Sequence, residues 1–436
     1  QATLETRAAK KEPRSEAEQR AAWKASMYAL EGGDIDRVEG RLSALLQHGA
    51  TRSNTLNDEQ ISDLAGQVLA TVSASRARFQ VDHLMAETLR RVRAFDLAAD
   101  IEDDTVTRVV AACQARESAV RLDAKDTVAE PMSVRREDGE SIYERPRSRV
   151  YTTVQTLAAE QRVIDASHVS TSHVVADEDV AAALLESVAN GTSLNPAQTQ
   201  LVTEMATSGK FTQLALAPAG SGKTTSMRVL AAAWEAAHPR SEGRLPGGGV
   251  LGLAPTAVAS KELGASINAR SDTLSKLIWH LEHPEHDEPE WMREVGAGTM
   301  IVLDEAGMAS TRDLAKLVTF ARSRDAVVRL IGDDQQLASV ASGGVLRDIA
   351  ADAGAITLSE LVRFRDPGEA AATLALREGN AMAIGFYLDH DRARVASEGD
   401  LEASVYAEWK QASEAGESAL MLAFSNDTVD ALNERA

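Results

Sequence analysis

The stretch LALAPAGSGKTTSMRVL at residues 214–230 decides the fold, because it joins a short apolar run to a glycine-rich turn and then to a helix-forming segment. The apolar run has the length of a buried strand, and the residues after the turn favour a helix. Similar short apolar runs recur, separated by helical segments, at 249–254, 299–303 and 327–331. Strands that alternate with helices in this way predict a parallel sheet, so the fold class is α/β.

The turn fits the phosphate-binding pattern G-x-x-x-x-G-K-[ST], with Ala217 where the first glycine would stand. Backbone N–H groups in such a turn cradle phosphates at the start of a helix. Lys223 would reach the β- and γ-phosphates, and the Thr224 hydroxyl would hold Mg²⁺. An ordinary glycine-rich turn is disfavoured, because GSGKTT directly after a strand is hard to match by chance. The sequence therefore predicts an ATP site that uses Gly220, Ser221, Gly222, Lys223, Thr224 and Thr225.

A second motif, TMIVLDEAGM at 299–308, ends an apolar strand with two carboxylates. Asp304 can face the Mg²⁺ shell, and Glu305 can activate a water for attack on the γ-phosphate. The pair is typical of hydrolysing motors and rare in small-molecule kinases. A solvated acidic pair at a strand end is the alternative, which the preceding phosphate-binding loop disfavours.

Three further stretches resemble motifs of superfamily-1 helicases. IGDDQQL at 331–337 resembles motif III, in which Gln336 would sense the γ-phosphate. LNPAQTQLV at 194–202 resembles the Q motif, which implies that Gln198 binds the adenine edge. LSELVRFRDP at 358–367 resembles motif IV, whose arginine reaches the γ-phosphate; Arg363 is the first choice and Arg365 the second.

Two stretches resemble the motifs through which these helicases contact single-stranded DNA. GLAPTAVAS at 252–260 resembles motif Ia and implies contacts through Pro255 and Thr256. SDTLSKL at 271–277 resembles motif Ic and implies a contact through Thr273. Each match alone is weak, and their order and spacing together make the helicase interpretation specific.

Together with REGNAMAIGFYLDHDR at 377–392 and MLAFSNDTVDALNERA at 421–436, these motifs resemble the RecD-like superfamily-1 helicase region of MobF-type conjugative relaxases, those of actinobacterial plasmids in particular. The resemblance is strong over 194–436 and weaker upstream. It implies an ATP- and Mg²⁺-dependent DNA helicase or translocase that unwinds plasmid DNA during conjugative transfer, in the 5′→3′ direction. The implied partners are single-stranded DNA, an upstream relaxase domain of the same polypeptide and the conjugative secretion machinery.

Two other functions remain as alternatives. One is a catalytically incomplete module that binds single-stranded DNA or acts as a scaffold with a P-loop fold. The other is a RecD-like repair helicase subunit. The histidine cluster and tyrosines of a relaxase do not occur near the N-terminus, so that domain is expected upstream. The later helicase motifs are expected beyond Ala436, which leaves open whether this chain hydrolyses ATP or unwinds DNA efficiently.

Composition limits the other classes. The chain has 436 residues, enough for two to four domains, and a net charge of −20 that argues against non-specific coating of DNA by the whole surface. The single cysteine, Cys113, excludes a disulfide framework within the chain. No uncharged apolar run approaches the roughly 20 residues that a membrane-spanning helix needs, which predicts a cytoplasmic protein without membrane insertion.

Changes in pattern along the chain predict its domains. They are a charged helical linker at 1–36, a helical N-terminal domain at 37–130, a hairpin and helical connector at 131–190, a RecA-like P-loop ATPase domain at 191–365, and the start of a truncated second RecA-like domain at 366–436. In the last of these, ESALMLAFS at 417–425 is predicted to form a strand.

Two patterns have weaker functional interpretations. His280, His283 and His286 have a spacing that suggests zinc, but Pro284 breaks the helix that would align them, so a surface insertion is the favoured interpretation. The expected hairpin carries several arginines that either contact DNA phosphates or form a solvated face paired with nearby glutamates: Arg135, Arg136, Arg145, Arg147 and Arg149.

Overall fold

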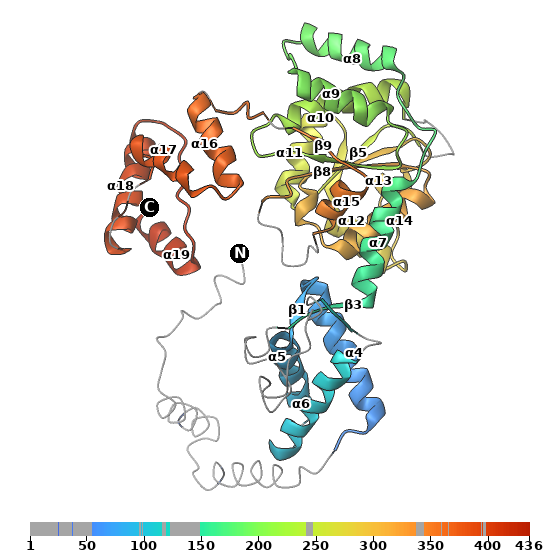
Figure 1. Ribbon diagram of the computed structural model, residues 1–436, viewed down its shortest axis with the longest axis vertical. Helices are drawn as coiled ribbons and strands as arrows, with labels where there is room; N and C mark the ends of the chain where they lie inside the picture. Colours follow the sequence, from blue (N-terminus) through green and yellow to red (C-terminus); the bar gives the residue numbers. More distant parts are fainter. Residues whose placement is uncertain are drawn as a thin grey trace, which may run out of the picture. The chain divides into compact units, whose positions relative to one another are not determined.

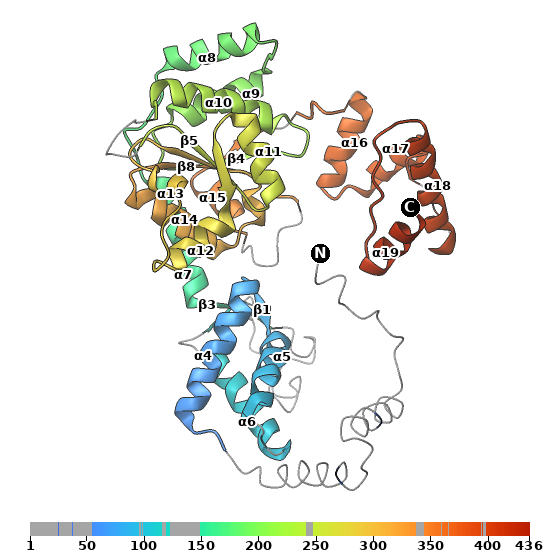
Figure 2. The ribbon, with the colours of Figure 1, turned by 180° about the vertical axis from the view of Figure 1, so that it is seen from behind.

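The structure is a computed structural model that describes residues 55–95, 97, 99–115, 119–122, 149–240, 247–336, 344–358, 360–364, 366–393, 395 and 398–436, together with 25 and 37. It divides into two compact units, shown in Figures 1 and 2. The first contains 1–162, 310–315 and 340–343, and the second contains 163–309, 316–339 and 344–436. Four of the five arginines of the expected hairpin lie outside the described residues: Arg135, Arg136, Arg145 and Arg147.

The first unit is a helical cluster with a small antiparallel sheet. Its elements are α4 (Asp58–Ser75), β1 (Phe79–Gln80), α5 (Val81–Val92), η1 (Arg93–Phe95), α6 (Ala99–Gln114), β2 (Ala119–Arg121) and β3 (Val150–Thr153). The strand order is β1-β3-β2. Phe79 lies in the strand directly before α5. Phe79, Leu84, Val109 and Cys113 are fully buried and share one core, so Cys113 is a core residue.

The second unit is built on a six-stranded parallel sheet with the order β6-β5-β7-β8-β4-β9. Its strands are β4 (Thr212–Leu216), β5 (Val250–Ala254), β6 (Arg270–Thr273), β7 (Met300–Leu303), β8 (Val327–Gly332) and β9 (Ile356–Thr357). Every residue of β4, β5, β7 and β8 is buried, as expected when helices cover both faces of a parallel sheet. The predicted α/β class with a parallel P-loop sheet is confirmed.

Helices form a layer on each side of this sheet (Figure 1). One layer shares its core with the strands through Leu201, Met205, Leu230, Trp234 and Leu263. It contains α8 (Asp177–Ala189), α9 (Pro196–Thr207), α10 (Lys223–Ala237) and α11 (Ala257–Ile267). The other side holds α12 (Leu274–Glu282), α13 (Glu290–Arg293), η3 (Ala306–Met308) and α15 (Val345–Asp352). Two helices, α7 (Val154–His168) and α14 (Thr311–Ser323), contribute residues to both units.

The described part of 366–436 is helical. It comprises α16 (Pro367–Arg377), η4 (Ala381–Ala383), α17 (Ile384–Asp389), α18 (Glu398–Glu414) and α19 (Asn426–Arg435). The strand predicted at 417–425 does not form, because no strand lies beside it among the described residues to accept its backbone hydrogen bonds. Its alternate residues Leu420, Leu422 and Phe424 are exposed. The second RecA-like domain therefore stays a prediction, as do the domain boundaries.

None of the helices described is long and apolar enough to cross a membrane.

Truncation of a central strand residue tests this core. Leu214 of β4 is fully buried, so Leu214→Ala should lower the free energy of unfolding by about 2–5 kcal/mol through lost burial and a residual cavity. The matched control is Leu185→Ala on α8, where the side chain is 71% exposed and the expected change is within about 0.5 kcal/mol. Urea titration followed by circular dichroism measures both, and equal changes would show that β4 is not a core strand.

Candidate nucleotide-binding site

The candidate site residues lie at one edge of the second unit's sheet. Parallel strands place their carboxyl ends together, and the predicted residues follow directly after four of these strands. The glycine-rich loop follows β4, Pro255 follows β5, Asp304 follows β7 and Asp333 follows β8. Thr273 is the last residue of β6 at the same edge.

The loop after β4 has the backbone of a phosphate cradle. Gly220 and Gly222 have φ values of +87° and +84°, which favour glycine over any residue with a Cβ. Gly222 is the N-cap of α10, and no side chain caps this helix end. The N–H groups of the first helical residues, Lys223, Thr224 and Thr225, therefore have no partner within the helix and remain for an anion.

An unpaired side chain also points to a ligand at this loop. Ser221 is 1% exposed, and its Oγ has no hydrogen-bond partner among the described residues. A buried hydroxyl without a partner is costly, so a phosphate oxygen that accepts its hydrogen bond would relieve that cost. The residues at the loop thus fit a bound nucleotide phosphate.

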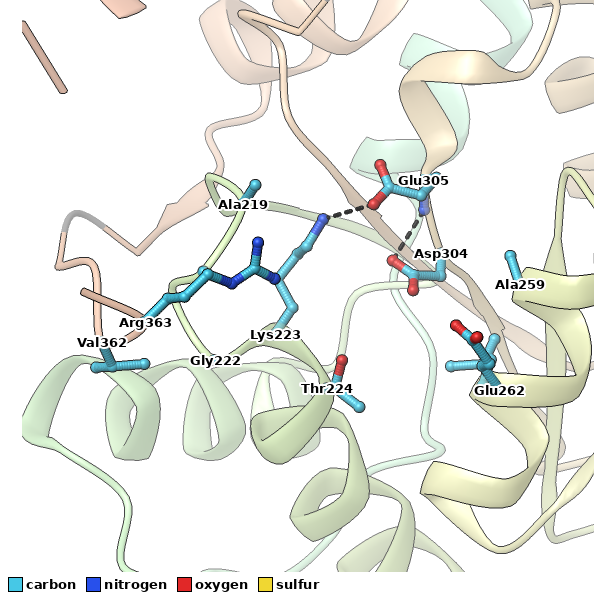
Figure 3. A pocket seen from close by; sticks show the side chains of 12 residues that line it. Ala219, Gly222, Lys223, Thr224, Ala259, Glu262, Asp304, Glu305, Val362 and Arg363 are labelled. Atoms are coloured by element: carbon cyan, nitrogen blue, oxygen red, sulfur yellow. Dashed lines mark hydrogen bonds and ion pairs between the residues drawn. The ribbon is translucent and has the colours of Figure 1, made fainter. Parts of the chain in front are cut away.

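A pocket of about 550 Å³ opens beside the loop (Figure 3). The loop lines it with Gly220, Gly222, Lys223 and Thr224, and the end of β7 adds Asp304 and Glu305. Val362 and Arg363 line another side, and α11 supplies Ala259, Glu262 and Leu263. Residues that lie far apart in the sequence therefore surround a single pocket.

Lys223 and Glu305 form an ion pair across this pocket. Lys223 Nζ lies 2.9 Å from Glu305 Oε1, and Figure 3 shows both side chains meeting above Asp304. Glu305 adopts a left-handed backbone with φ +50°, which is uncommon for a residue with a side chain. A strained conformation at a pocket is typical of functional sites.

Asp304 lies deeper than Glu305 and accepts a hydrogen bond from the Glu305 backbone N–H at 2.9 Å. Burial raises the pKa of the Asp304 carboxyl, although the Lys223 charge and the Glu305 N–H act in the opposite direction. A partly desolvated carboxylate is the kind of group that a divalent metal ion stabilises. Thr224 lines the pocket beside it, so the pair could hold Mg²⁺.

Gln198 lies beneath the loop. Its Nε2 donates to the Ser221 carbonyl at 2.9 Å, and its Oε1 accepts from the Asn195 N–H at 3.0 Å in the capping box of α9. A Cβ on Gly222 would lie 2.1 Å from Gln198 Nε2, so the amide fills the space that a glycine leaves. Gln198 therefore supports the loop in this structure; its predicted contact with adenine stays a prediction.

Arg363 is attached to the loop through the backbone. The N–H groups of Val362 and Arg363 donate to the Gly220 carbonyl at 2.9 and 3.1 Å. The Arg363 side chain extends into the pocket towards Lys223 (Figure 3). Arg365, the second choice for this role, lies outside the described residues.

Other predicted residues lie outside the pocket lining. Gln336 is exposed in the turn after β8, and Thr225 continues the first turn of α10. Thr256 and Thr273 are N-caps, whose side-chain oxygens accept from Ala259 N and Lys276 N. Their hydroxyl protons remain free to donate, and Pro255 is half-buried beside Thr256.

Glu262 lines the pocket from α11, although none of the sequence motifs that predicted the site includes it. It lies one helical turn after Ala259, so helical spacing from the start of α11 places both on the same face. Figure 3 shows its carboxylate directed towards the space beside Thr224. It adds a third acidic group to this side of the pocket.

His280, His283 and His286 are the residues whose spacing suggested zinc. No group of three or more metal-binding side chains occurs in the part of the chain that the structure describes. Trp279 stacks on His283 and His286, with ring centroids at 4.6 and 4.9 Å. The three rings form a local aromatic stack, in which Trp279 is 42% exposed.

Most of the second unit is similar to a known protein family. Residues 193–398 match the family model described as an AAA domain. That range contains the loop, the Asp304–Glu305 pair and Arg363. The similarity to this family therefore covers the sheet and the pocket of the second unit.

The chain is also similar to three individual proteins. The chain is 33% identical over 223 residues to the probable conjugal transfer protein TraA of Sinorhizobium fredii, covering 50% of this chain and 18% of that protein. It is 30% identical over 224 residues to the conjugal transfer protein TraA of Agrobacterium fabrum, with the same coverage of 50% and 18%. It is also 31% identical over 183 residues to the RecBCD enzyme subunit RecD of Mycolicibacterium smegmatis, covering 38% of this chain and 32% of that protein.

These matches confirm the predicted resemblance to the RecD-like helicase region of TraA-type proteins. The chain spans less than a fifth of the length of the TraA relatives it matches. Among solved structures, an arterivirus nonstructural protein 10 helicase in complex with DNA is similar, at 16% identity and a TM-score of 0.24 over 38% of this chain and 40% of that chain.

The pKa of Asp304 predicts how its charge affects stability. Its pKa is raised in the folded state, so the folded protein holds the proton more tightly, and stability falls as pH rises above the ordinary value of 3.8. Asp304→Asn removes the buried charge and should raise the melting temperature at pH 7, with the gain disappearing below about pH 3.8. Thermal melting across this pH range measures it.

The control is Asp287→Asn, an exposed substitution that should leave melting unchanged. A melting temperature of Asp304→Asn equal to or below that of the wild type at pH 7 would contradict a buried, destabilising charge.

The space beneath Gly222 gives a second prediction. Gly222→Ala introduces a Cβ at φ +84° that displaces the Gln198 amide and breaks its hydrogen bond to the Ser221 carbonyl, so the loop loses this support and nucleotide affinity should fall at least about tenfold. Gly191→Ala is the matched control, because Gly191 has φ +80° with nothing within 4 Å of the new Cβ. Titration with a fluorescent ATP analogue distinguishes them; equal affinity in both variants would show that Gln198 does not support the loop.

Proposed function

We propose that this chain is the ATP-dependent motor segment of a conjugative relaxase, which moves along single-stranded DNA and unwinds plasmid DNA during conjugative transfer. One observation carries the proposal: Lys223, Thr224, Asp304, Glu305 and Arg363 converge on one pocket from separate elements. A loop that only bound phosphate would need the first two alone. The carboxylate pair and the arginine are what hydrolysis requires in addition.

The Lys223–Glu305 pair sets the first step. When ATP binds, Lys223 exchanges Glu305 for the phosphate oxygens, because a phosphate carries more charge than one carboxylate. Glu305 is then free to accept a proton from the attacking water. The backbone N–H groups at the start of α10 and the Ser221 hydroxyl hold the phosphate chain in place.

Asp304 and Thr224 would hold Mg²⁺, which neutralises charge on the phosphate oxygens. Arg363 reaches into the pocket and stabilises the charge that develops on the transferred phosphoryl group. Its backbone is bonded to Gly220, so a movement of 362–363 also moves the loop. Hydrolysis is thereby linked to the segment that begins α16.

The DNA-contact residues support the choice of substrate. Thr256 lies two residues after β5, and Thr273 is the last residue of the adjacent strand β6, at the same sheet edge as the pocket. Each is the N-cap of a helix. Helix N-termini and hydroxyl donors suit phosphates of a DNA backbone. A cytoplasmic location is proposed from the single cysteine of the chain. The role in conjugative transfer is proposed from the similarity to the conjugal transfer protein TraA. The 5′→3′ direction is proposed from the resemblance of the motifs to the helicase region of conjugative relaxases. An upstream relaxase domain and the secretion machinery are proposed as partners on the same grounds.

Two alternative functions make different predictions. A non-catalytic module that binds single-stranded DNA would keep DNA affinity without ATP turnover. A repair helicase subunit, favoured by the similarity to RecD, would hydrolyse ATP but act at double-strand ends. The convergence of the hydrolytic residues disfavours the first, and the higher identity to TraA over more of the chain disfavours the second.

ATP hydrolysis by the 436-residue chain, with and without single-stranded DNA, tests the proposal. Lys223→Ala and Glu305→Gln should each lower the rate at least about a hundredfold, because one removes a phosphate contact and the other the proton acceptor. Glu305→Gln should still bind ATP. Lys410→Ala, on exposed α18, is the charge-matched control and should retain the wild-type rate.

DNA binding without hydrolysis by the chain and by a version extended beyond Ala436 would overturn the motor function in favour of the binding module. Activity in the extended version alone would assign turnover to the longer protein.

A further inference from the structure

Arg377 is the last residue of α16, and its guanidinium lies against the turn that follows β8. Arg377 Nη2 bonds to Asp333 Oδ1 and lies 3.1 Å from Asp334 Oδ1. The Asp333 side chain is 3% exposed, so this cation neutralises a carboxylate that would otherwise be buried alone. None of the motifs that predicted the site includes Arg377 in this role.

The turn that Arg377 contacts leads directly to Gln336. Asp333 Oδ1 also accepts from the Gln335 N–H at 3.0 Å, which closes an Asx-type turn. Arg347 of α15 donates to the Asp334 carbonyl at 3.0 Å from the other side. The backbone that orients Gln336 is therefore fixed by two arginines and one carboxylate.

The same turn packs on the segment after Glu305. A Cβ on Gly307 would lie 3.3 Å from the Asp333 carbonyl, and one on Gly332 would lie 3.3 Å from Gly307 N. These glycines allow the backbones after β7 and β8 to approach closely. A shift of the turn would therefore reach the carboxylates that follow β7.

The other end of α16 is attached to the phosphate loop. Val362 and Arg363, just before α16, bond to the Gly220 carbonyl. Asp366 caps the helix through the Gly368 N–H at 2.8 Å. The segment from Val362 to the end of α16 therefore runs from the phosphate loop to the turn after β8, and the helix of 11 residues makes up about 16 Å of it.

We propose that Arg377 is a positioning residue that makes α16 a strut between the phosphate loop and the Gln336 turn, so that binding of a γ-phosphate is transmitted to the helices after α16. This rests on the proposed function, because it assumes that the pocket holds a nucleoside triphosphate. Arg377 is not among the residues that line the pocket. It acts through Asp333 and the turn.

The test is the preference for a triphosphate over a diphosphate, which requires no turnover. The affinities of the 436-residue chain for ADP and for the non-hydrolysable analogue AMPPNP, both with Mg²⁺, are measured by calorimetry. Arg377→Gln should reduce the AMPPNP-over-ADP preference by between about twofold and thirtyfold while ADP affinity stays unchanged. A purely structural role would change both affinities together or change only the melting temperature.

Arg392→Gln is the matched control. Arg392 pairs with Glu369 of α16, so its substitution removes the same charge beside the same helix. No contact joins Arg392 to the turn after β8 among the described residues. Arg377→Lys should largely restore the preference, because one nitrogen, Nη2, makes the contacts with both Asp333 and Asp334, and a lysine ammonium can replace it. Asp334→Asn should reproduce part of the loss, and its effect should not add to that of Arg377→Gln.

The outcomes separate this proposal from the proposed function. A wild-type chain that binds neither nucleotide overturns both. A wild-type chain that binds ADP but shows no preference for AMPPNP overturns the strut alone. An unchanged preference in Arg377→Gln, or an equal loss in Arg392→Gln, also overturns it.

Discussion

The left-handed backbone at Gly220 and Gly222 is the constraint on which the rest of the site depends. It turns the chain sharply from β4 into α10 and leaves the first N–H groups of that helix without a side-chain cap. The absence of a Cβ at Gly222 admits the Gln198 amide from below, and the Gly220 carbonyl receives the segment before α16 from outside. The loop is thus fixed by neighbours on two sides while its inner surface stays open to a ligand.

The carboxylates at the end of β7 show how function and stability oppose each other in this pocket. Asp304 is half-buried, so that desolvation outweighs the nearby Lys223 charge, and Glu305 holds a left-handed backbone while it pairs with Lys223. Both features cost free energy in the folded protein. A metal ion that compensated the desolvation of Asp304 would add to the favourable free energy of nucleotide binding.

The fold and much of the site could be predicted from the sequence because both depend on local patterns. Short apolar runs followed by glycine, lysine and carboxylates define strand ends, and parallel strands bring those ends together whatever the distance between them in the chain. Glu262 and Arg377 could not be found in this way, since each belongs to the site only through tertiary contact of a helix. The strand expected at 417–425 does not form for a related reason. Alternating apolar residues allow a segment to be a strand, but the segment becomes one only when a neighbouring strand pairs with it.

The irregular segment before α19 has a consequence for the chain in solution. Its alternate residues Leu420, Leu422 and Phe424 are exposed, and its backbone groups pair with no strand in the described structure. An apolar segment with unpaired backbone groups can pair with a second copy of itself. The net charge of −20 opposes that encounter through long-range repulsion, which salt screens. The colloidal behaviour of this chain should therefore be governed by ionic strength, with self-association rising as the shielding of its acidic surface increases.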